Sequence, residues 1–215
     1  MCANTSERRC GRGRGAAMRW LKPVVFLLSL VPFVRLFVLG YHGRLGANPV
    51  EFVTHSTGWW ALTFLCLTLT VTPLRRLAGW TAVARLRRML GLYAFFYAFA
   101  HFVTYAWFDQ GFAIDEILKD IVKRPFITAG FAAFLLLIPL AATSTSRMMK
   151  RLGRRWATLH KLVYPIAALG VLHFWWLKSD KNDLAEPAWF AAAVLLLLGV
   201  RIGFALRQRR VAAMR

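Results

Sequence analysis

Apolar residues gather in six long segments of the chain, and short polar connections separate these segments. A helix needs about 20 mostly apolar residues to cross the hydrocarbon core of a bilayer. The pattern therefore predicts an all-α integral membrane protein, folded as a six-helix transmembrane bundle without a separate soluble domain. No internal repeat is evident. The predicted spans are residues 23–40, 52–71, 89–108, 125–142, 156–177 and 187–206.

Two stretches outside the spans have their own character. The connection at residues 112–124 is too polar to cross a membrane, and we expect an amphipathic helix that lies on the outer surface of the membrane. The Gly- and Arg-rich stretch before Met18 lacks apolar periodicity. Residues 1–18 are therefore predicted to form a disordered basic tail, and residues 19–210 a single transmembrane domain.

Composition and charge agree with a membrane protein. Of the 215 residues, 58% are hydrophobic, and the mean hydropathy is +0.48. The net charge of +20 comes from Lys and Arg residues at alternate ends of the spans, so nucleic acid is not a predicted partner. By the positive-inside rule these basic ends, and both termini, are expected in the cytoplasm. Most acidic residues fall on the opposite side: Glu51, Asp109, Asp115, Glu116, Asp120, Asp180, Asp183 and Glu186.

Three histidines lie inside the predicted spans, where an ionisable residue is costly and is a functional candidate by default. At about 1.5 Å per residue, His101 lies roughly 20 Å along the third span. On the fifth span His160 lies about 8 Å from the basic end, and His173 roughly 20 Å further out. His101 and His173 therefore share a level. Two imidazoles that face each other across a bundle can fill both axial positions of one heme iron.

His160 has no other histidine at its level, because His42 and His55 fall near the outer ends of the first two spans. It is a candidate ligand of a second heme iron, alone or with an unidentified partner, or a residue that simply hydrogen-bonds a neighbouring helix. Thirteen residues separate it from His173, which is roughly 140° around a straight helix. Pro165 lies between them and can bend the helix. For His42 and His55, we expect water to satisfy the imidazoles.

Absent motifs narrow the chemistry further. The sequence has no CxxCH motif for covalent heme attachment and no CxxC pair, so any heme is held without a covalent bond to cysteine. It also has no GxGxxG motif after a strand. A soluble reductase domain is therefore not predicted.

Several runs of the sequence resemble one bacterial family through loops as well as spans. It is the family of the heme-binding membrane subunit of protein-methionine-sulfoxide reductase systems, called MsrQ or YedZ, within the ferric reductase-like transmembrane group. The resemblance covers about residues 20–205. It is carried by LGANPVEFVTHSTGWWAL, TPLRRLAG, RRMLGLYAFFYAFAHFVTY, KRPFITAG, TSTSRMMKRLGRRWATLHKLVY and GVLHFWWLKS.

The resemblance implies a multi-pass cytochrome of the bacterial inner membrane that carries heme b and FMN. It would take electrons from membrane quinones or a cytoplasmic flavin reductase and pass them to a periplasmic molybdopterin enzyme that reduces methionine sulfoxide. The family's heme histidines fall on His101, His160 and His173, and His55 also occupies a shared position. The related NADPH oxidases carry two histidines on each ligating span. Here the third span has only His101, which argues against a second bis-histidine heme.

Two other functions fit parts of the sequence. A ferric-chelate reductase would deliver electrons to extracellular metal without a protein partner. A membrane transporter or scaffold, whose histidines handle protons or only pack, would contain no heme and would be colourless when purified.

Overall fold

The computed structural model describes residues 6–79, 81–179 and 182–213, and it contains helices and no strands in these ranges. Six helical stretches there are long and apolar enough to cross a membrane, which confirms the predicted all-α bundle. They overlap all six predicted segments. The spans are Trp20–Tyr41, Pro49–Leu77, Val83–Asp109, Pro125–Ala142, Arg154–Ser179 and Ala185–Gln208.

The chain divides into two compact units, Met1–Gly46 and Ala47–Arg215. The first unit is built on one helix, α1 (Ser6–Tyr41). Leu27 and Leu28 expose more than half of their side-chain surface, as expected where lipid is the solvent. Helix α1 begins at Ser6 and so includes most of the predicted tail, residues 1–18, while residues 1–5 lie outside the described residues. The disorder of the tail stays a prediction.

The second unit contains two closely packed helix pairs. Helix α2 packs along α3, helix α5 packs along α8, and α9 contacts both α2 and α8. Short elements connect the long helices. The long helices are α2 (Pro49–Leu77), α3 (Arg87–Thr104), α5 (Pro125–Ala142), α8 (Val163–Ser179) and α9 (Ala185–Ala213). The short elements are η1 (Thr81–Arg85), the π-helix η2 (Tyr105–Asp109), α4 (Ile114–Lys123), α6 (Ser146–Leu152), α7 (Arg154–Leu159) and η3 (His160–Leu162).

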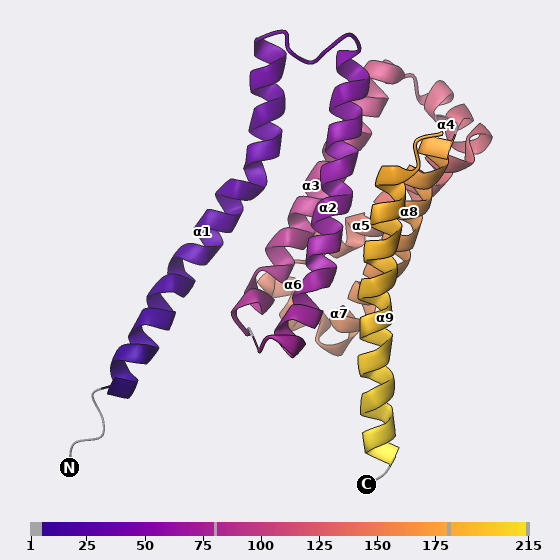
Figure 1. Ribbon diagram of the computed structural model, residues 1–215. Helices are drawn as coiled ribbons and strands as arrows, with labels where there is room; N and C mark the ends of the chain where they lie inside the picture. Colours follow the sequence, from indigo (N-terminus) through magenta and orange to yellow (C-terminus); the bar gives the residue numbers. More distant parts are fainter. Residues whose placement is uncertain (1–5, 80, 180–181, 214–215) are drawn as a thin grey trace, which may run out of the picture. The chain divides into compact units, whose positions relative to one another are not determined.

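Because the long helices alternate in direction, the second unit has two chemically distinct ends. Helix α4 lies at one end and helices α6 and α7 lie at the other, as Figure 1 shows. All described Asp and Glu residues of this unit lie at the end with α4, which we call the acidic end. The opposite end, with the end of α2, the start of α3 and helices α6 and α7, is called the basic end.

Local sequence signals begin several of these helices. The side chain of Asn48 accepts a hydrogen bond of 3.2 Å from the backbone N–H of Glu51, and Pro49 follows at the first helical position of α2. Such a cap satisfies an N–H group that the helix leaves free, and proline has no N–H to satisfy. Pro125 likewise stands at the first helical position of α5, although no side chain caps that helix.

Helix α4 is the amphipathic helix expected at residues 112–124. Ile114, Leu118 and Val122 recur every fourth position and are exposed. Its polar face is fixed through Asp120, which accepts hydrogen bonds from the Tyr105 hydroxyl at 3.1 Å and the Gln110 amide at 2.8 Å. Its placement on the membrane surface stays a prediction.

The core between α2 and α3 is aromatic. The ring of Phe64 stacks on the rings of Tyr93 and Tyr97, with centroid distances of 5.5 and 5.3 Å. Tyr97 and Leu69 are completely buried. Aromatic stacking of this kind is worth about 0.5–1.5 kcal/mol beyond the area it buries. It holds α3, and with it His101, in a fixed rotation against α2.

Candidate cofactor site

His101 on α3 and His173 on α8 lie opposite each other inside the second unit. Their ring centroids are 5.9 Å apart, and the ring planes make an angle of 77°. The two residues come from different helix pairs, so the site lies where the pairs meet. The expectation that His101 and His173 share a level is confirmed.

A backbone carbonyl orients each of these two rings. Nδ1–H of His101 donates to the carbonyl oxygen of Thr54 at 2.8 Å, and Nδ1–H of His173 donates to that of Phe126 at 2.7 Å. A carbonyl oxygen can only accept, so the proton must be on Nδ1. This leaves the lone pair on Nε2, the nitrogen that a metal would bind, and fixes the ring orientation as metal-binding histidines require.

A glycine lies against each ring, four residues after the carbonyl that the ring contacts. A Cβ atom at Gly58 would be 3.0 Å from Nδ1 of His101, and one at Gly130 would be 2.7 Å from Nδ1 of His173. Both distances are too short for ordinary contact. Only glycine therefore lets the histidine-bearing helix approach its neighbour closely enough for the Nδ1–carbonyl bond to form.

The two half-sites repeat the same arrangement, although the sequence showed no evident repeat. In both, 47 residues separate the histidine from the carbonyl that accepts its hydrogen bond. The α2–α3 pair contributes Thr54, Gly58 and His101. The α5–α8 pair contributes Phe126, Gly130 and His173. The site is thus built from two equivalent halves.

The donor set fits heme better than an isolated metal ion. Bonds from imidazole nitrogen to a metal such as zinc are about 2.0–2.1 Å long. The 5.9 Å between the two ring centres therefore leaves room for one metal ion bound by both imidazoles. The described residues contain no group of three or more His, Cys, Asp or Glu side chains that could hold a metal ion. Two imidazoles alone leave the equatorial positions to another ligand, which a porphyrin supplies.

His160 lies apart from this pair, in the short helix η3 toward the basic end. Its Nδ1–H donates to the carbonyl oxygen of Trp156 at 3.1 Å, and its ring stacks on the indole at a centroid distance of 3.9 Å. The indole N–H donates to the carbonyl oxygen of Thr143 at 3.0 Å. Nε2 of His160 is buried and has no hydrogen-bond partner among the described residues. One possible ligating nitrogen is therefore present.

The structure brings no second histidine to His160. Arg88 stands thirteen residues before His101, the same spacing that separates His160 from His173. Its guanidinium donates to the Ser146 hydroxyl at 3.2 Å and is exposed. Arg88 therefore stands where the same spacing would place a fourth histidine, and its side chain makes a surface contact with Ser146.

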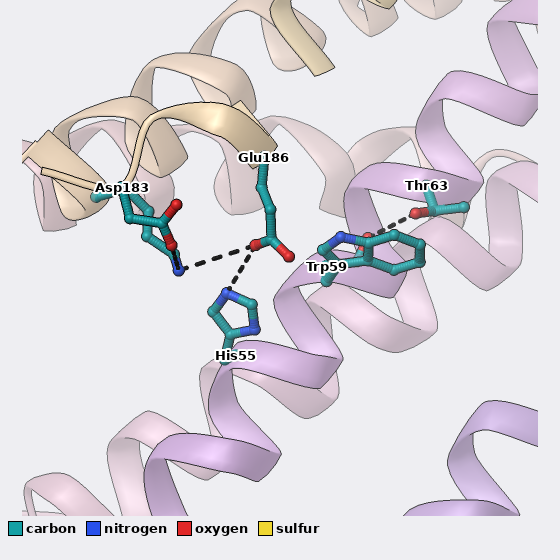
Figure 2. Close-up of polar contacts among 6 residues, drawn as sticks. His55, Trp59, Thr63, Asp183 and Glu186 are labelled. Carbon is teal, nitrogen blue, oxygen red and sulfur yellow. Dashed lines mark hydrogen bonds and ion pairs between the residues drawn. The ribbon is translucent and has the colours of Figure 1, made fainter. Parts of the chain in front are cut away.

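His55 lies at the acidic end beside the His101 half-site. Figure 2 shows its ring from α2 directed toward Glu186 from α9, with Nε2 3.4 Å from the carboxylate. Lys178 lies 2.9 Å from Asp183 and 3.8 Å from Glu186. His55 also follows Thr54 directly and lies 5.8 Å from the ring of Phe174. His55 therefore borders the candidate site. We expected water to satisfy its imidazole, and the Glu186 carboxylate also lies close to it.

Sequence reasoning identified the histidines and missed the groups that orient them. The carbonyls of Thr54 and Phe126 carry no side-chain signal. Gly58 and Gly130 did carry one, because a glycine inside an apolar span often marks a close approach between two helices. The runs HSTG and ITAG contain these glycines at the same distance before a histidine.

Comparison with known proteins places the chain in a family. The model of the family described as ferric reductase like transmembrane component matches residues 57–171, which include both glycines, His101 and His160. The protein-methionine-sulfoxide reductase heme-binding subunit MsrQ of Herminiimonas arsenicoxydans is 57% identical over 190 residues, which cover 88% of this chain and 87% of that protein. The chain belongs to the MsrQ family. This confirms the resemblance found in the sequence.

Other MsrQ proteins show the same extent of similarity. The MsrQ subunit of Ralstonia nicotianae is 55% identical over 198 residues, covering 92% of this chain and 91% of its own. That of Bordetella pertussis is 52% identical, covering 89% and 93%. Similarity to MsrQ therefore extends well beyond the histidine-bearing helices. No solved structure matches the chain.

Proposed function

We propose that this chain is the membrane cytochrome b subunit of a methionine sulfoxide reductase system. In this proposal it carries electrons across the bacterial inner membrane to a periplasmic molybdopterin-containing catalytic subunit, which repairs oxidised proteins. The observation that carries the proposal is the His101–His173 pair, in which each Nδ1–H is bound to a backbone carbonyl. The printed names of the relatives, which describe heme-binding subunits, support it.

In this function His101 and His173 would hold heme b through Nε2. Bound heme b supplies one-electron transfer, and two histidine ligands leave no open iron position for a substrate. The carbonyls of Thr54 and Phe126 hold the rings in one orientation, so the ligands need not move when an electron arrives or leaves. Reduction of methionine sulfoxide belongs to the catalytic subunit, and this chain provides the electron path.

The placement of the pair favours delivery toward the acidic end. His101 is near the end of α3 and His173 is near the end of α8, and both helices run toward the acidic end. The positive-inside rule places the basic end in the cytoplasm. The proposed heme would therefore lie on the periplasmic side of the bilayer, nearer to a periplasmic acceptor than to a cytoplasmic donor.

Electrons would enter from the respiratory quinone pool or from a cytoplasmic flavin reductase. FMN is proposed from the family resemblance alone. His160 is proposed as a further heme-iron ligand because its buried Nε2 has no hydrogen-bond partner in the part of the chain that the structure describes. The histidine pair is sufficient for one heme without it.

The first experiment records the oxidised and dithionite-reduced absorption spectra of the purified full chain in detergent, with heme quantified per chain. We expect the sharp reduced bands of a low-spin heme b. A colourless protein, from cells with ample heme, would contradict the proposal and favour a transporter or scaffold.

A second experiment tests the acceptor. The full chain in vesicles is reduced with a quinol, and reoxidation of its heme is followed with the purified catalytic subunit and methionine sulfoxide, or with a ferric chelate alone. We expect rapid reoxidation only with the catalytic subunit and its substrate. Equal reoxidation by the ferric chelate without that subunit would favour a ferric-chelate reductase.

A further inference from the structure

Three helices meet at the acidic end beside the histidine pair, and each contributes one polar side chain and one aromatic ring. The helices are α2, α8 and α9, and α9 contacts both of the others. On each helix the ring stands four residues from the polar side chain, about one turn deeper in the bundle. The three combinations are His55 with Trp59, Lys178 with Phe174, and Glu186 with Phe190. We call this place the aromatic corner.

The three rings of the aromatic corner contact one another. The centroid of the Phe190 ring lies 5.6 Å from that of Trp59 and 6.0 Å from that of Phe174. The planes meet at 81° and 70°, which is the favourable edge-to-face geometry. The imidazole of His55 lies 5.8 Å from the Phe174 ring. The polar side chains therefore stand at the edge of a continuous aromatic surface.

One oxygen at the aromatic corner is available as a hydrogen-bond acceptor. Oε2 of Glu186 is buried and accepts no hydrogen bond from the described residues, although the Glu186 side chain as a whole is 44% exposed. Figure 2 shows the His55 ring directed at this oxygen, with Nε2 at 3.4 Å. Lys178 lies 3.8 Å from it and is bound more closely to Asp183, at 2.9 Å. A buried acceptor without a hydrogen bond is costly, so a ligand that donates one would stabilise the corner.

The charges at the aromatic corner favour a neutral ligand. Glu186 and Asp183 carry two negative charges against the one positive charge of Lys178, so a phosphate or carboxylate would be repelled. The described residues also contain no group of three or more side chains that could hold a metal ion. A neutral ring with a hydroxyl group fits both features of the corner. Its hydroxyl can donate to the carboxylate, and its ring can pack on the aromatic surface.

The aromatic corner can be reached from the lipid. Only 6% of the apolar part of the α9 span is buried inside the structure. Trp189, Leu195 and Leu196 on this helix expose 78%, 70% and 68% of their surface. In a membrane these side chains meet lipid. A ligand dissolved in the bilayer can therefore approach the corner along α9 without crossing the bundle.

The aromatic corner borders both halves of the histidine pair. His55 directly follows Thr54, whose carbonyl accepts the hydrogen bond from His101. Phe174 directly follows His173. A ligand at the corner would therefore lie next to the proposed electron carrier, at the end of the bundle where the pair is located.

We propose that the aromatic corner binds a membrane quinol, a neutral ring with two hydroxyl groups, and that Glu186 and His55 receive its protons. The inference rests on the proposed function for its electron acceptor. Oxidation of one quinol to quinone breaks two O–H bonds and releases two protons and two electrons. The electrons pass one at a time to the heme that His101 and His173 would hold. Glu186 and His55 accept one proton with each electron and release it to water through their exposed sides.

This arrangement also separates substrate from product. A quinol hydroxyl donates a hydrogen bond to the Glu186 carboxylate, whereas a quinone has only acceptor oxygens. Once Glu186 has released its proton, the carboxylate no longer has a donor to bind. The product therefore binds more weakly than the substrate and leaves along α9 into the lipid.

The first test measures binding and does not depend on heme. The full chain is placed in lipid nanodiscs, and the dissociation constant of heptyl-hydroxyquinoline N-oxide, a fluorescent and redox-inert quinol analogue with one hydroxyl group, is measured against empty nanodiscs. Glu186→Gln removes the charged acceptor, and Phe190→Leu removes one ring. The matched controls are Asp183→Asn, which affects only Lys178, and Trp189→Leu, whose side chain is exposed next to Phe190.

We expect Glu186→Gln to weaken binding of the analogue about tenfold, as for one lost hydrogen bond to a charged group. Phe190→Leu should weaken it about threefold to tenfold, as for one lost aromatic contact. Asp183→Asn and Trp189→Leu should bind as the wild type does.

The second test follows the electrons. Decylubiquinol is mixed with the heme-loaded chain without oxygen, and the rate of heme reduction is recorded. We expect Glu186→Gln to slow this reduction about 100-fold, because a positioned proton acceptor contributes about that much or more, and His55→Gln to slow it as well. Dithionite, which needs no binding site, should reduce the heme of every variant as it does in the wild type.

The outcomes separate this inference from the proposed function. A chain without dithionite-reducible heme would contradict the proposed function, and the binding test would still decide the inference. The inference is overturned if the wild type binds no more analogue than empty nanodiscs do. It is also overturned if Glu186→Gln binds the analogue as tightly as the wild type, or if quinol reduces its heme equally fast. Monodisperse elution shows that a variant has folded, and if Glu186→Gln does not fold, Phe190→Leu decides against Trp189→Leu.

Discussion

The His101–His173 pair and His160 differ in what holds the imidazole ring. At the His101–His173 pair, a neighbouring helix supplies both the carbonyl that binds Nδ1 and the glycine that makes room for the ring. At His160, the carbonyl and the stacked indole both come from Trp156, one turn earlier in the same segment. The first arrangement depends on tertiary packing, and the second is local.

The difference shows why one place is a complete ligand set and the other is not. A ring held by a neighbouring helix is fixed relative to the opposite half of the bundle, where the second ligand stands. A ring held by its own segment is fixed only relative to that segment. A position inside a predicted span, which His160 shares, does not by itself create a site with two facing ligands.

The largest expected effect comes from removing one ligand of the pair. We expect His101→Ala and His173→Ala each to abolish the low-spin heme b spectrum, with heme affinity reduced by more than the roughly 10–100-fold typical of losing an outer-shell partner. His160→Ala should retain that spectrum. Reduced-minus-oxidised spectra and heme per chain measure this. The exposed His42 provides the control His42→Ala. If the His173→Ala variant kept the low-spin spectrum, the His101–His173 pair would not be the ligand set of the heme.

The next largest effect concerns the glycines. Gly130→Ala places a Cβ 2.7 Å from Nδ1 of His173, so the ring must move and its bond to Phe126 must weaken. We expect about a 10–100-fold loss of heme affinity and a changed low-spin electron paramagnetic resonance signal. Gly58→Ala, at 3.0 Å from His101, should have a smaller effect.

Gly199→Ala is the matched control for these variants, because a Cβ there meets nothing within 4 Å. It lies in a helix, as Gly58 and Gly130 do, and so shares any general effect of the substitution on helix propensity. If all three variants bind heme equally well, Gly58 and Gly130 are not needed for the close approach of the helices at the histidine pair.

A third prediction concerns His160. Trp156→Leu removes the indole that stacks on His160 and the hydrogen bond to the Thr143 carbonyl. We expect the free energy of unfolding to fall by about 1–2 kcal/mol, as for one hydrogen bond and one aromatic contact. The spectrum of heme at the His101–His173 pair should not change. Thermal unfolding in detergent and the absorption spectrum measure the two effects, and a loss of that heme would show that the two places are coupled.

The smallest effect is expected at the border of the pair. Glu186→Gln removes the charge that faces His55 in Figure 2 and that lies 3.8 Å from Lys178. Because the side chains of His55 and Glu186 are 35% and 44% exposed, the change in unfolding free energy should stay below about 1 kcal/mol. Asp183→Asn, which affects only Lys178, is the control. A larger shift in thermal unfolding for Glu186→Gln would assign His55 a part in holding the first half-site.

The sequence predicted the features that depend on length and depth. The six spans follow from apolar length, and the common level of His101 and His173 follows from counting residues along two helices. The carbonyls of Thr54 and Phe126 could not be predicted, because they depend on how each helix pair is rotated. The hydrogen bonds of Arg201 on α9 to the Tyr164 hydroxyl and the Leu69 carbonyl depend in the same way on how α9 packs. The wide angle expected between His160 and His173 assumed a straight helix, whereas a 3₁₀ turn at His160–Leu162 precedes Val163.

The division of the site into two equivalent halves has a consequence for the order of events during synthesis. The α2–α3 half, with Thr54, Gly58 and His101, is synthesised before the α5–α8 half. At that moment a captured cofactor would have one protein ligand and an open face. The second ligand, His173, is made only with α8, and α9 is the one long helix that follows. Cofactor capture from both sides is therefore a late step of biogenesis, and a chain that stops before α8 would enter the membrane without a closed site.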